Sequence, residues 1–202
     1  VAVINIGGIA NISWLSEDGR IAAFDTGPGN VLLNDWVKQH SELPHDEDGK
    51  LAAAGKVDEQ ILNYYLGHPY FSDPYPKSLD RNAFSLSPVA RLSLEDGAAT
   101  LTEFTTRSIA LAAKYFPDKP KQWIFCGGGC HNKTMVAQLR KYCGNVALAS
   151  ELGWNNDAIE AQAFGFFAVR SLQGKPLTFP ETTGTTRAVT GGAVYQVAGG
   201  GQ

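Results

Sequence analysis

The spacing of apolar residues predicts three consecutive strands at the start of the chain. They cover Val1–Ile6, Ile9–Leu15 and Arg20–Phe24, and each is a short, mainly apolar run. The residues Ser16–Gly19 between the last two runs are typical of a tight turn. We therefore expect the second and third strands to form a hairpin.

Farther along the chain, apolar positions recur at helical spacing. We expect helices over Gly29–His40, Leu51–Leu66, Thr100–Phe116, Asn132–Tyr142 and Asp157–Leu172. Two further strands are expected at Gln122–Cys126 and Val146–Ala149. Strands followed by helices and then by strand–helix alternation indicate an α/β domain, with a mixed sheet flanked by helices.

The segment Gly67–Phe84 contains three prolines and fits no regular element. Long loops of this kind are uncommon in compact domains unless they serve a function. We find no internal repeat or domain boundary, so residues 1–202 are expected to form one domain.

The amino-acid composition excludes some classes of binding partner. The net charge of −3 gives no basic footprint for nucleic acid or anionic lipid, and no apolar run approaches the length of a membrane span. The three cysteines are odd in number and follow no disulfide framework, which favours a reducing cytoplasm.

Two glycine-rich turns carry the strongest chemical signal. They are Asn5–Asn11, with the sequence NIGGIAN, and Phe24–Asn30, with the sequence FDTGPGN. Glycine brings backbone N–H groups close to a ligand, and such groups attract phosphate. A carboxylate in such a turn repels an anion unless it handles Mg²⁺ or accepts a proton from a nucleophile. Asp25 therefore points to phosphoryl transfer.

Each of these turns also has a structural interpretation. Asp25 could brace its own turn, and the local pattern leaves the two roles even. Gly7 and Gly8 could form a tight hairpin turn. The residues after Asp25 could form a phosphate cradle, a strand-to-helix connection or both. They are Thr26, Gly27, Gly29 and Asn30.

A glycine triplet, Gly127–Gly129, follows a predicted strand and precedes a predicted helix. That position suits a nucleotide lying against backbone, and it also suits close packing of helix on strand. Asn132 could contact the nucleotide or cap the helix. Cys126, Cys130 and His131 lack a second ligand pair, so we reject a zinc site.

The order and spacing of five segments resemble those of the 1,6-anhydro-N-acetylmuramic acid kinases. The segments are Asn5–Asn11, Phe24–Asn30, Pro76–Ser78, Cys126–Asn132 and Glu151–Phe164. These enzymes are sugar kinases of the actin/hexokinase/Hsp70-like superfamily, so the resemblance implies a ribonuclease-H-like, actin/hexokinase-type ATPase domain. Leu79–Asn82 departs from the Thr-Gly-Arg-Glu run that many relatives carry at this place.

The resemblance implies a specific reaction. Asp25 would be the general base that activates water, and water would attack the anomeric carbon and open the 1,6-bridge. The released sixth-carbon oxygen would take the γ-phosphoryl group of ATP, which yields N-acetylmuramate 6-phosphate in cell-wall recycling. ATP and Mg²⁺ are the implied cofactors, and Asp25 would act on the metal only indirectly.

The resemblance also implies roles for other residues. Gly7 and Gly8 would lie near the phosphates or the sugar, and Gly127, Gly128 and Gly129 would form the adenosine motif. Asn11 and Glu160 would bind the sugar, although Glu160 also fits a capping box with Asp157 as N-cap. Lys77 and Arg81 would meet the lactyl carboxylate of the sugar or remain solvated loop charges.

The chain begins inside a predicted strand and lacks the amino-terminal half of the family. We therefore expect the carboxy-terminal ATPase-like domain of a two-domain kinase, inactive alone, with its cleft facing the missing domain. A homodimer is left open. The alternatives are another small-molecule kinase of the superfamily and a non-catalytic nucleotide-binding module.

Overall fold

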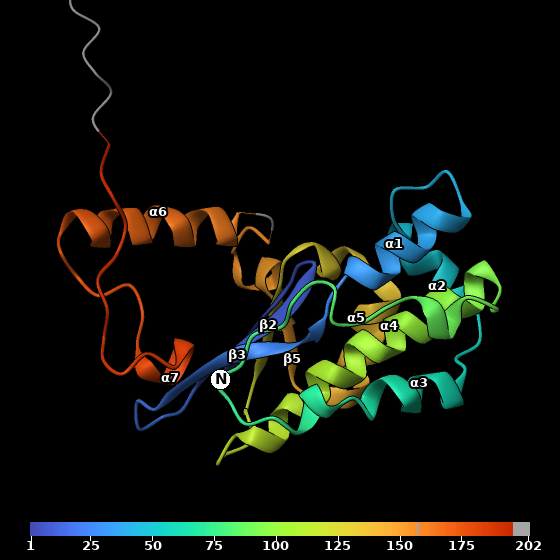
Figure 1. The fold of residues 1–202 in the computed structure, drawn as a ribbon, viewed down its shortest axis with the longest axis horizontal. Coiled ribbons are helices and arrows are strands. Elements are labelled where there is room, and N and C mark those ends of the chain that lie inside the picture. Colours follow the sequence, from blue (N-terminus) through green and yellow to red (C-terminus); the bar gives the residue numbers. More distant parts are fainter. Residues whose placement is uncertain (157, 196–202) are drawn as a thin grey trace, which may run out of the picture.

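A computed structural model describes residues 1–156 and 158–195 of the chain. A five-stranded sheet lies at its centre, in the order β3-β2-β1-β4-β5 (Figure 1). The first three strands form an antiparallel meander, and the last two run parallel to β1. The strands are β1 (Ala2–Ile6), β2 (Ile9–Leu15), β3 (Ile21–Pro28), β4 (Trp123–Cys126) and β5 (Val146–Leu148).

Helices cover one face of this sheet, with α4 in contact with α1, α2, α3 and α5. The α-helices are α1 (Val31–His40), α2 (Lys50–Ala54), α3 (Glu59–Leu66), α4 (Leu94–Leu111), α5 (Lys133–Cys143), α6 (Ile159–Leu172) and α7 (Pro180–Thr183). Short 3₁₀ helices occur at Glu47–Gly49, Pro69–Ser72, Ser87–Val89, Ala112–Tyr115, Gly128–His131 and Ala149–Leu152. Within the part of the chain that is described, no helix is long and apolar enough to cross a membrane.

The expected fold class is confirmed. The antiparallel meander, the helical crossover to β4 and the second crossover through α5 to β5 form the expected mixed sheet flanked by helices. The predicted hairpin is also present, since the Ser16 N–H donates to the Arg20 carbonyl at 3.0 Å.

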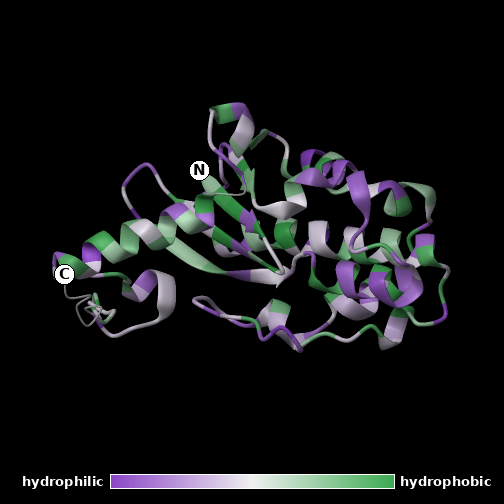
Figure 2. Cartoon of the chain, turned by 90° about the horizontal axis from the view of Figure 1, so that it is seen from above, coloured by the Kyte–Doolittle hydropathy of each residue, from purple (hydrophilic) through white to green (hydrophobic). Residues whose placement is uncertain are grey.

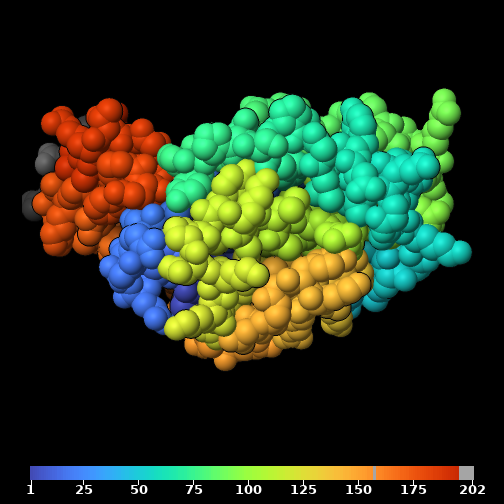
Figure 3. All heavy atoms as spheres, turned by 90° about the horizontal axis from the view of Figure 1, so that it is seen from below, coloured from blue at the N-terminus to red at the C-terminus, as the bar shows by residue number. Residues whose placement is uncertain are grey.

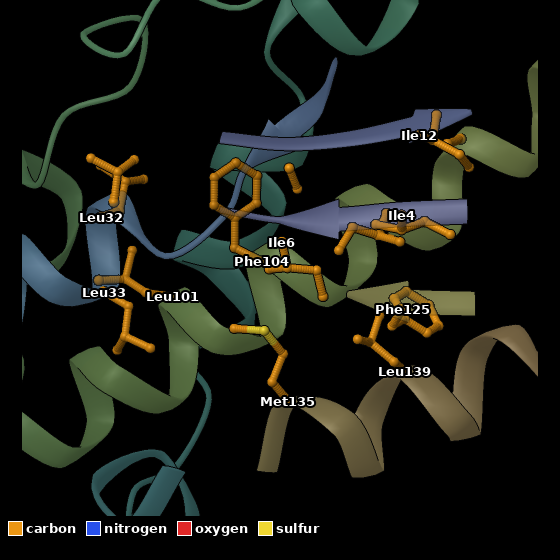
Figure 4. Packing of buried hydrophobic residues seen from close by; sticks show 14 of the residues in the cluster. Ile4, Ile6, Ile12, Leu32, Leu33, Leu101, Phe104, Phe125, Met135 and Leu139 are labelled. Atoms are coloured by element: carbon orange, nitrogen blue, oxygen red, sulfur yellow. The ribbon is translucent and has the colours of Figure 1, made fainter. Parts of the chain in front are cut away.

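The main core lies between the sheet and helices α1, α4 and α5. Alternate residues of β1 and β2 point into it, as the period of a strand requires. Figure 4 shows how side chains from strands and helices meet there, among them Ile4, Ile6, Ile12, Phe125, Leu101, Phe104, Met135 and Leu139. All of these side chains are almost fully buried.

Helix α4 differs from the predicted amphipathic helix Thr100–Phe116. It begins earlier, at Leu94, because the Ser93 hydroxyl caps it by accepting the Asp96 N–H at 3.1 Å. Its polar residues are buried as well as its apolar ones, including Thr100, Thr102, Thr105, Thr106 and Ser108. The helix is therefore buried on its polar side as well, where the hydroxyl groups of Thr100, Thr105, Thr106 and Ser108 donate to nearby carbonyls.

The prediction of one helix over Leu51–Leu66 is wrong, because the structure has two helices there, α2 and α3. Backbone packing breaks it at Gly55, where a Cβ atom would lie 2.0 Å from the Glu95 carbonyl oxygen. Asp58 then starts α3 by accepting the N–H groups of Gln60 and Ile61.

The other face of the sheet carries much less cover. Ile124, Cys126 and Ala149 form a small buried cluster there, with Val3 and Ile159 packed against it. Helix α6 stands beside this face as a separate arm (Figures 1 and 3). It contains no buried residue.

Phe104 is the residue of α4 on which the core depends most clearly. Its side chain is fully buried, and its ring stacks on Tyr65 with centroids 4.7 Å apart. We expect Phe104→Ala to lower the free energy of unfolding by about 3–5 kcal/mol, because a large cavity remains. Denaturant unfolding will measure it. Leu111→Ala, on the same helix but 37% exposed, should cost less than about 1 kcal/mol; equal costs would contradict this account of the core.

Candidate active site

Asp25 lies on the face of the sheet that points away from the main core. In β3 the core-facing residues alternate with less buried ones, and Asp25 belongs to the second set. The neighbouring strand places Asn11 directly opposite it. The two polar side chains therefore share one face of the sheet.

The loop that follows α3 holds Asp25 at both its backbone and its carboxylate. The Asp25 N–H donates to the Lys77 carbonyl at 3.0 Å, and the Tyr70 hydroxyl donates to the Asp25 carbonyl at 2.5 Å. The Leu79 N–H donates to carboxylate oxygen Oδ2 at 2.7 Å. Within residues 1–156 and 158–195, the other oxygen, Oδ1, accepts no hydrogen bond. The carboxylate is thus oriented, with one oxygen available.

Burial raises the pKa of Asp25, and the hydrogen bond from Leu79 opposes this only in part. A carboxylate with a raised pKa is a stronger base than an ordinary aspartate. Such a group is better matched to accepting a proton near neutral pH. Asp25 therefore combines a fixed orientation with the electrostatics of a general base.

Lys77 anchors this loop from inside. Its ammonium lies over the rings of Tyr70 and Tyr115, 4.4 and 4.6 Å from their centroids. It donates to the Tyr70 carbonyl at 2.7 Å and to the Tyr115 hydroxyl at 3.0 Å. Burial lowers its pKa. The Lys77 ammonium therefore has its partners within the protein. Arg81, farther along the loop, forms an ion pair with Asp35 at 3.4 Å.

An open hollow of about 460 Å³ borders Asp25, a size that suits a small polar molecule. Its polar lining comes from β2, β3, the loop and α7, and comprises Asn11, Ser13, Asp25, Lys77, Ser78, Thr182 and Thr183. We call this the first hollow.

The two glycine turns are joined by backbone hydrogen bonds. The N–H groups of Gly29 and Val31 donate to the Gly8 carbonyl at 2.9 and 3.1 Å, and the Asn30 N–H donates to the Gly7 carbonyl at 2.8 Å. A Cβ atom at Gly29 would lie 2.3 Å from the Gly7 oxygen. Only glycine permits this approach.

The same bonds decide which N–H groups remain for a ligand. Those of Gly29 and Asn30 are used within the protein, the Thr26 hydroxyl donates to the Ala10 carbonyl, and Gly27 packs on Ser108. The structure thus gives these four residues a part in the strand-to-helix connection, and their contact with phosphate stays a prediction. The N–H groups of Gly7 and Gly8 find no acceptor among the described residues.

The glycine triplet divides into packing and open positions. Gly127 has a φ of +83°, and its Cβ would lie 2.3 Å from Asn5 Oδ1; that of Gly129 would lie 2.3 Å from Ile6 Cγ2. At Gly128 the nearest atom to a Cβ would be Asn30 Nδ2, at 3.9 Å. Close packing therefore explains the outer two glycines, and Gly128 faces open space.

A second hollow, of about 480 Å³, borders Gly128. Its lining includes Asn30, Asn34, Asp46, His131 and Asn132. Asn132 Oδ1 caps α5 by accepting the Met135 N–H at 2.9 Å, so the N-cap interpretation is confirmed. Its buried Nδ2 has no hydrogen-bond partner in the part of the chain that is described, nor do the N–H groups of Gly128 and Gly129.

The model of the family described as anhydro-N-acetylmuramic acid kinase matches residues 1–197. The chain belongs to this family. A relative of that name from Rhodospirillum rubrum is 48% identical over 98% of the chain, and one from Paramagnetospirillum magneticum is 50% identical over 95%. The chain spans about half the length of these curated relatives, 53% and 55%.

Among solved structures, one similar chain is the activator of the 2-hydroxyisocaproyl-CoA dehydratase from Clostridium difficile with bound ADPNP. It is 15% identical, with a TM-score of 0.45, and the match covers 73% of this chain and 53% of that one.

Five of the residues expected to act in this kinase family line the two hollows. Asn11 lies with Asp25 at the first, Asn30, Gly128 and Asn132 lie at the second, and Gly7 and Gly8 are bonded to the segment between them.

Glu160 is not brought to either hollow. It is exposed in the first turn of α6, so its contact with sugar stays a prediction. Asp157, its proposed capping partner, lies outside the described residues.

No group of three or more His, Cys, Asp or Glu that could hold a metal ion occurs among residues 1–156 and 158–195. A contribution of Asp25 to a metal therefore stays a prediction. Cys126 and Cys130 are buried and form no disulfide, and burial raises the pKa of the Cys126 thiol to about 11.

Reasoning from the sequence missed the residues that orient Asp25. Tyr70, Lys77 and Leu79 do so through the loop Gly67–Phe84, whose length and prolines indicated a function but not these contacts with Asp25. Thr182 and Thr183 reach the first hollow from the far end of the chain, and no motif marks them.

Asp25→Asn tests the electrostatics of the site through stability. Because the folded state binds the Asp25 proton more tightly than the unfolded state, the free energy of unfolding falls as pH rises from 3.8 through the raised pKa. We therefore expect Asp25→Asn to melt at a higher temperature than the parent at pH 7. The difference should disappear below the ordinary pKa. Melting curves across pH will show this, and a lower melting temperature at pH 7 would contradict it.

Proposed function

We propose that this chain is the carboxy-terminal half of an ATP-dependent kinase acting on 1,6-anhydro-N-acetylmuramic acid. The intact enzyme would open the anhydro bridge by hydrolysis and form N-acetylmuramate 6-phosphate, a step in cell-wall recycling. Asp25 carries the proposal: it is an oriented, half-buried carboxylate with a raised pKa and one oxygen that accepts no bond from a described residue. Membership of the kinase family supplies the substrate.

In the proposed reaction, Asp25 Oδ1 takes a proton from water as the water oxygen bonds to the anomeric carbon. The bond from that carbon to the bridging oxygen breaks, and the oxygen stays on the sixth carbon, where it takes the γ-phosphoryl group of ATP. Asn11, opposite Asp25, would bind the sugar in the first hollow. One base thereby serves both hydrolysis and phosphorylation.

ATP would lie against the second hollow. The N–H groups of Gly7, Gly8, Gly128 and Gly129 have no acceptor within the described ranges and can bind phosphate or ribose oxygens. Gly128 offers a surface without side chain, which lets a ligand approach the backbone. Mg²⁺ would neutralise charge on the phosphates. Bound Mg²⁺ usually has one or two carboxylates near it in addition to the phosphates, and Asp25 would be such a carboxylate without being a direct ligand.

The remaining half of the enzyme would close the other side of the cleft. Both hollows are open in this chain, and closure would exclude water from unproductive attack. The three cysteines form no disulfide, which agrees with a reducing cytoplasm. The partners in this proposal are the sugar, ATP and the amino-terminal domain.

Steady-state kinetics of Asp25→Asn in the intact protein test the proposal. Asparagine keeps the shape and can accept the Leu79 N–H, but it cannot take a proton from water near neutral pH. We expect kcat to fall at least about 10² to 10⁴-fold, the usual contribution of a general base. ATP and sugar should bind within a few-fold of the parent.

Asp118→Asn is the matched control, because Asp118 is an exposed carboxylate that pairs with Arg20. It should keep the parental kcat, and the 202-residue chain alone should show background rates. A stable Asp25→Asn protein with near-parental kcat would remove the proposed base. ATP binding without turnover in the parent would favour a nucleotide-binding module.

Gly128→Val tests the nucleotide position. Its side chain would enter the second hollow without meeting protein atoms closely, so stability should change by less than about 1 kcal/mol. Calorimetry on the intact protein should show ATP affinity at least about tenfold weaker, a loss of about 1.4 kcal/mol.

Gly129→Ala provides the contrast at the neighbouring position. Its Cβ would meet Ile6, so overpacking should lower stability by about 1–3 kcal/mol. Unchanged ATP affinity in Gly128→Val would leave the triplet with a packing role alone.

A further inference from the structure

Helix α6 is apolar on all sides and yet exposed. Five large side chains, which we call the α6 surface, are Phe164, Phe166, Phe167, Val169 and Leu172, with exposed fractions of 67, 58, 38, 52 and 68%. Figure 2 shows hydrophobic colour along this arm, outside the main body. No residue of α6 is buried.

The α6 surface surrounds the helix instead of forming one stripe. Successive residues of an α-helix are turned by about 100°, so these five positions spread around the whole axis. A helix that is hydrophobic all round is normally buried inside a protein. The helix therefore needs a partner that covers several of its sides.

Contacts hold α6 at both ends, with the buried cluster of the sheet at one end and with the segment that follows the helix at the other. Ile159 packs against the buried cluster of Ile124, Cys126 and Ala149. At the other end, the Arg170 side chain donates to the Pro176 carbonyl at 2.7 Å, and the Ser171 hydroxyl donates to the Gly191 carbonyl at 2.6 Å. These contacts fix the position of the exposed helix.

We propose that the α6 surface is the docking element for the other half of the intact protein, the part of its relatives that this chain does not span. The family match runs through α6, and the chain spans only about half the length of the curated relatives that share this helix region. The partner would be an apolar recess of that half into which α6 inserts.

A second copy of this chain fits the α6 surface less well. A pair of helices related by a two-fold axis buries one stripe on each helix and leaves the other sides in water. Insertion into a recess covers several sides at once, as the distribution of the five side chains requires.

Docking at α6 would place the other half beside the first hollow. After α6 the chain returns to β3, where α7 packs and its Thr182 and Thr183 line that hollow. The segment that leaves the docked helix therefore forms part of the wall around Asp25. This inference rests on family membership and not on the proposed reaction.

Hydrogen exchange of residues 159–172 tests the docking. In the intact protein these amides should exchange at least about tenfold more slowly than in the 202-residue chain, at concentrations where both are monomers by light scattering. Equal exchange would overturn the proposal. Protection that appears in the 202-residue chain only as its concentration rises would assign the surface to a second copy and overturn it as well.

A variant pair gives an independent readout. Phe164 is 67% exposed in this chain and Tyr64, on α3, is 70% exposed. We expect Phe164→Ala to lower the melting temperature of the intact protein by at least about 5 °C and to leave that of the 202-residue chain within about 1 °C. Tyr64→Ala should change neither.

Equal shifts for Phe164→Ala in the two proteins would contradict docking at α6. Kinase assays on the parent keep the two proposals separate. An intact protein that protects α6 but lacks sugar-dependent ADP release would overturn the proposed function alone, and an active protein with unprotected α6 would overturn the docking alone.

Discussion

The contact between the two glycine turns organises this domain. Helix α1 has no side-chain cap at Asn30, and the N–H groups of Asn30 and Val31 instead donate to the carbonyls of Gly7 and Gly8. This ties the β1–β2 connection to the β3–α1 connection at a distance that only glycine allows at position 29. The N–H groups of Gly7 and Gly8 themselves find no acceptor among the described residues.

The glycine triplet converges on the same place. β1 and β4 are parallel, so both end at one edge of the sheet, and Gly127 and Gly129 pack on Asn5 and Ile6 at the end of β1. Ligands of α/β sheets bind outside the carboxyl ends of the strands. From the other side, the buried Thr105 hydroxyl of α4 contacts the Pro28 and Gly29 carbonyls at 3.1 and 2.9 Å. The core and the candidate site thus share one set of contacts.

Local signals in the sequence were enough for the order of the strands, and glycine runs mark the ends of β1 and β4. The predicted third strand ended at Phe24, whereas β3 continues to Pro28 and so places Asp25 opposite Asn11 on one face of the sheet. Long-range contacts were not accessible in this way. Gly55 breaks a helix because Glu95 comes close to it, and Asp25 is oriented by Tyr70 and Leu79, 45 and 54 residues farther along. Such pairs exist only once segments that are distant in the sequence have packed together.

The open face of the sheet connects the base to the docking helix. Asp25 is half-buried here, and burial already raises its pKa. A second half docked through α6 would remove more water from the first hollow, and bound phosphates would add negative charge nearby. Both changes disfavour the ionised carboxylate and raise its pKa further. In the proposed enzyme, the strength of the base would therefore depend on closure, so that Asp25 becomes most basic when the sugar and the nucleotide are enclosed with it.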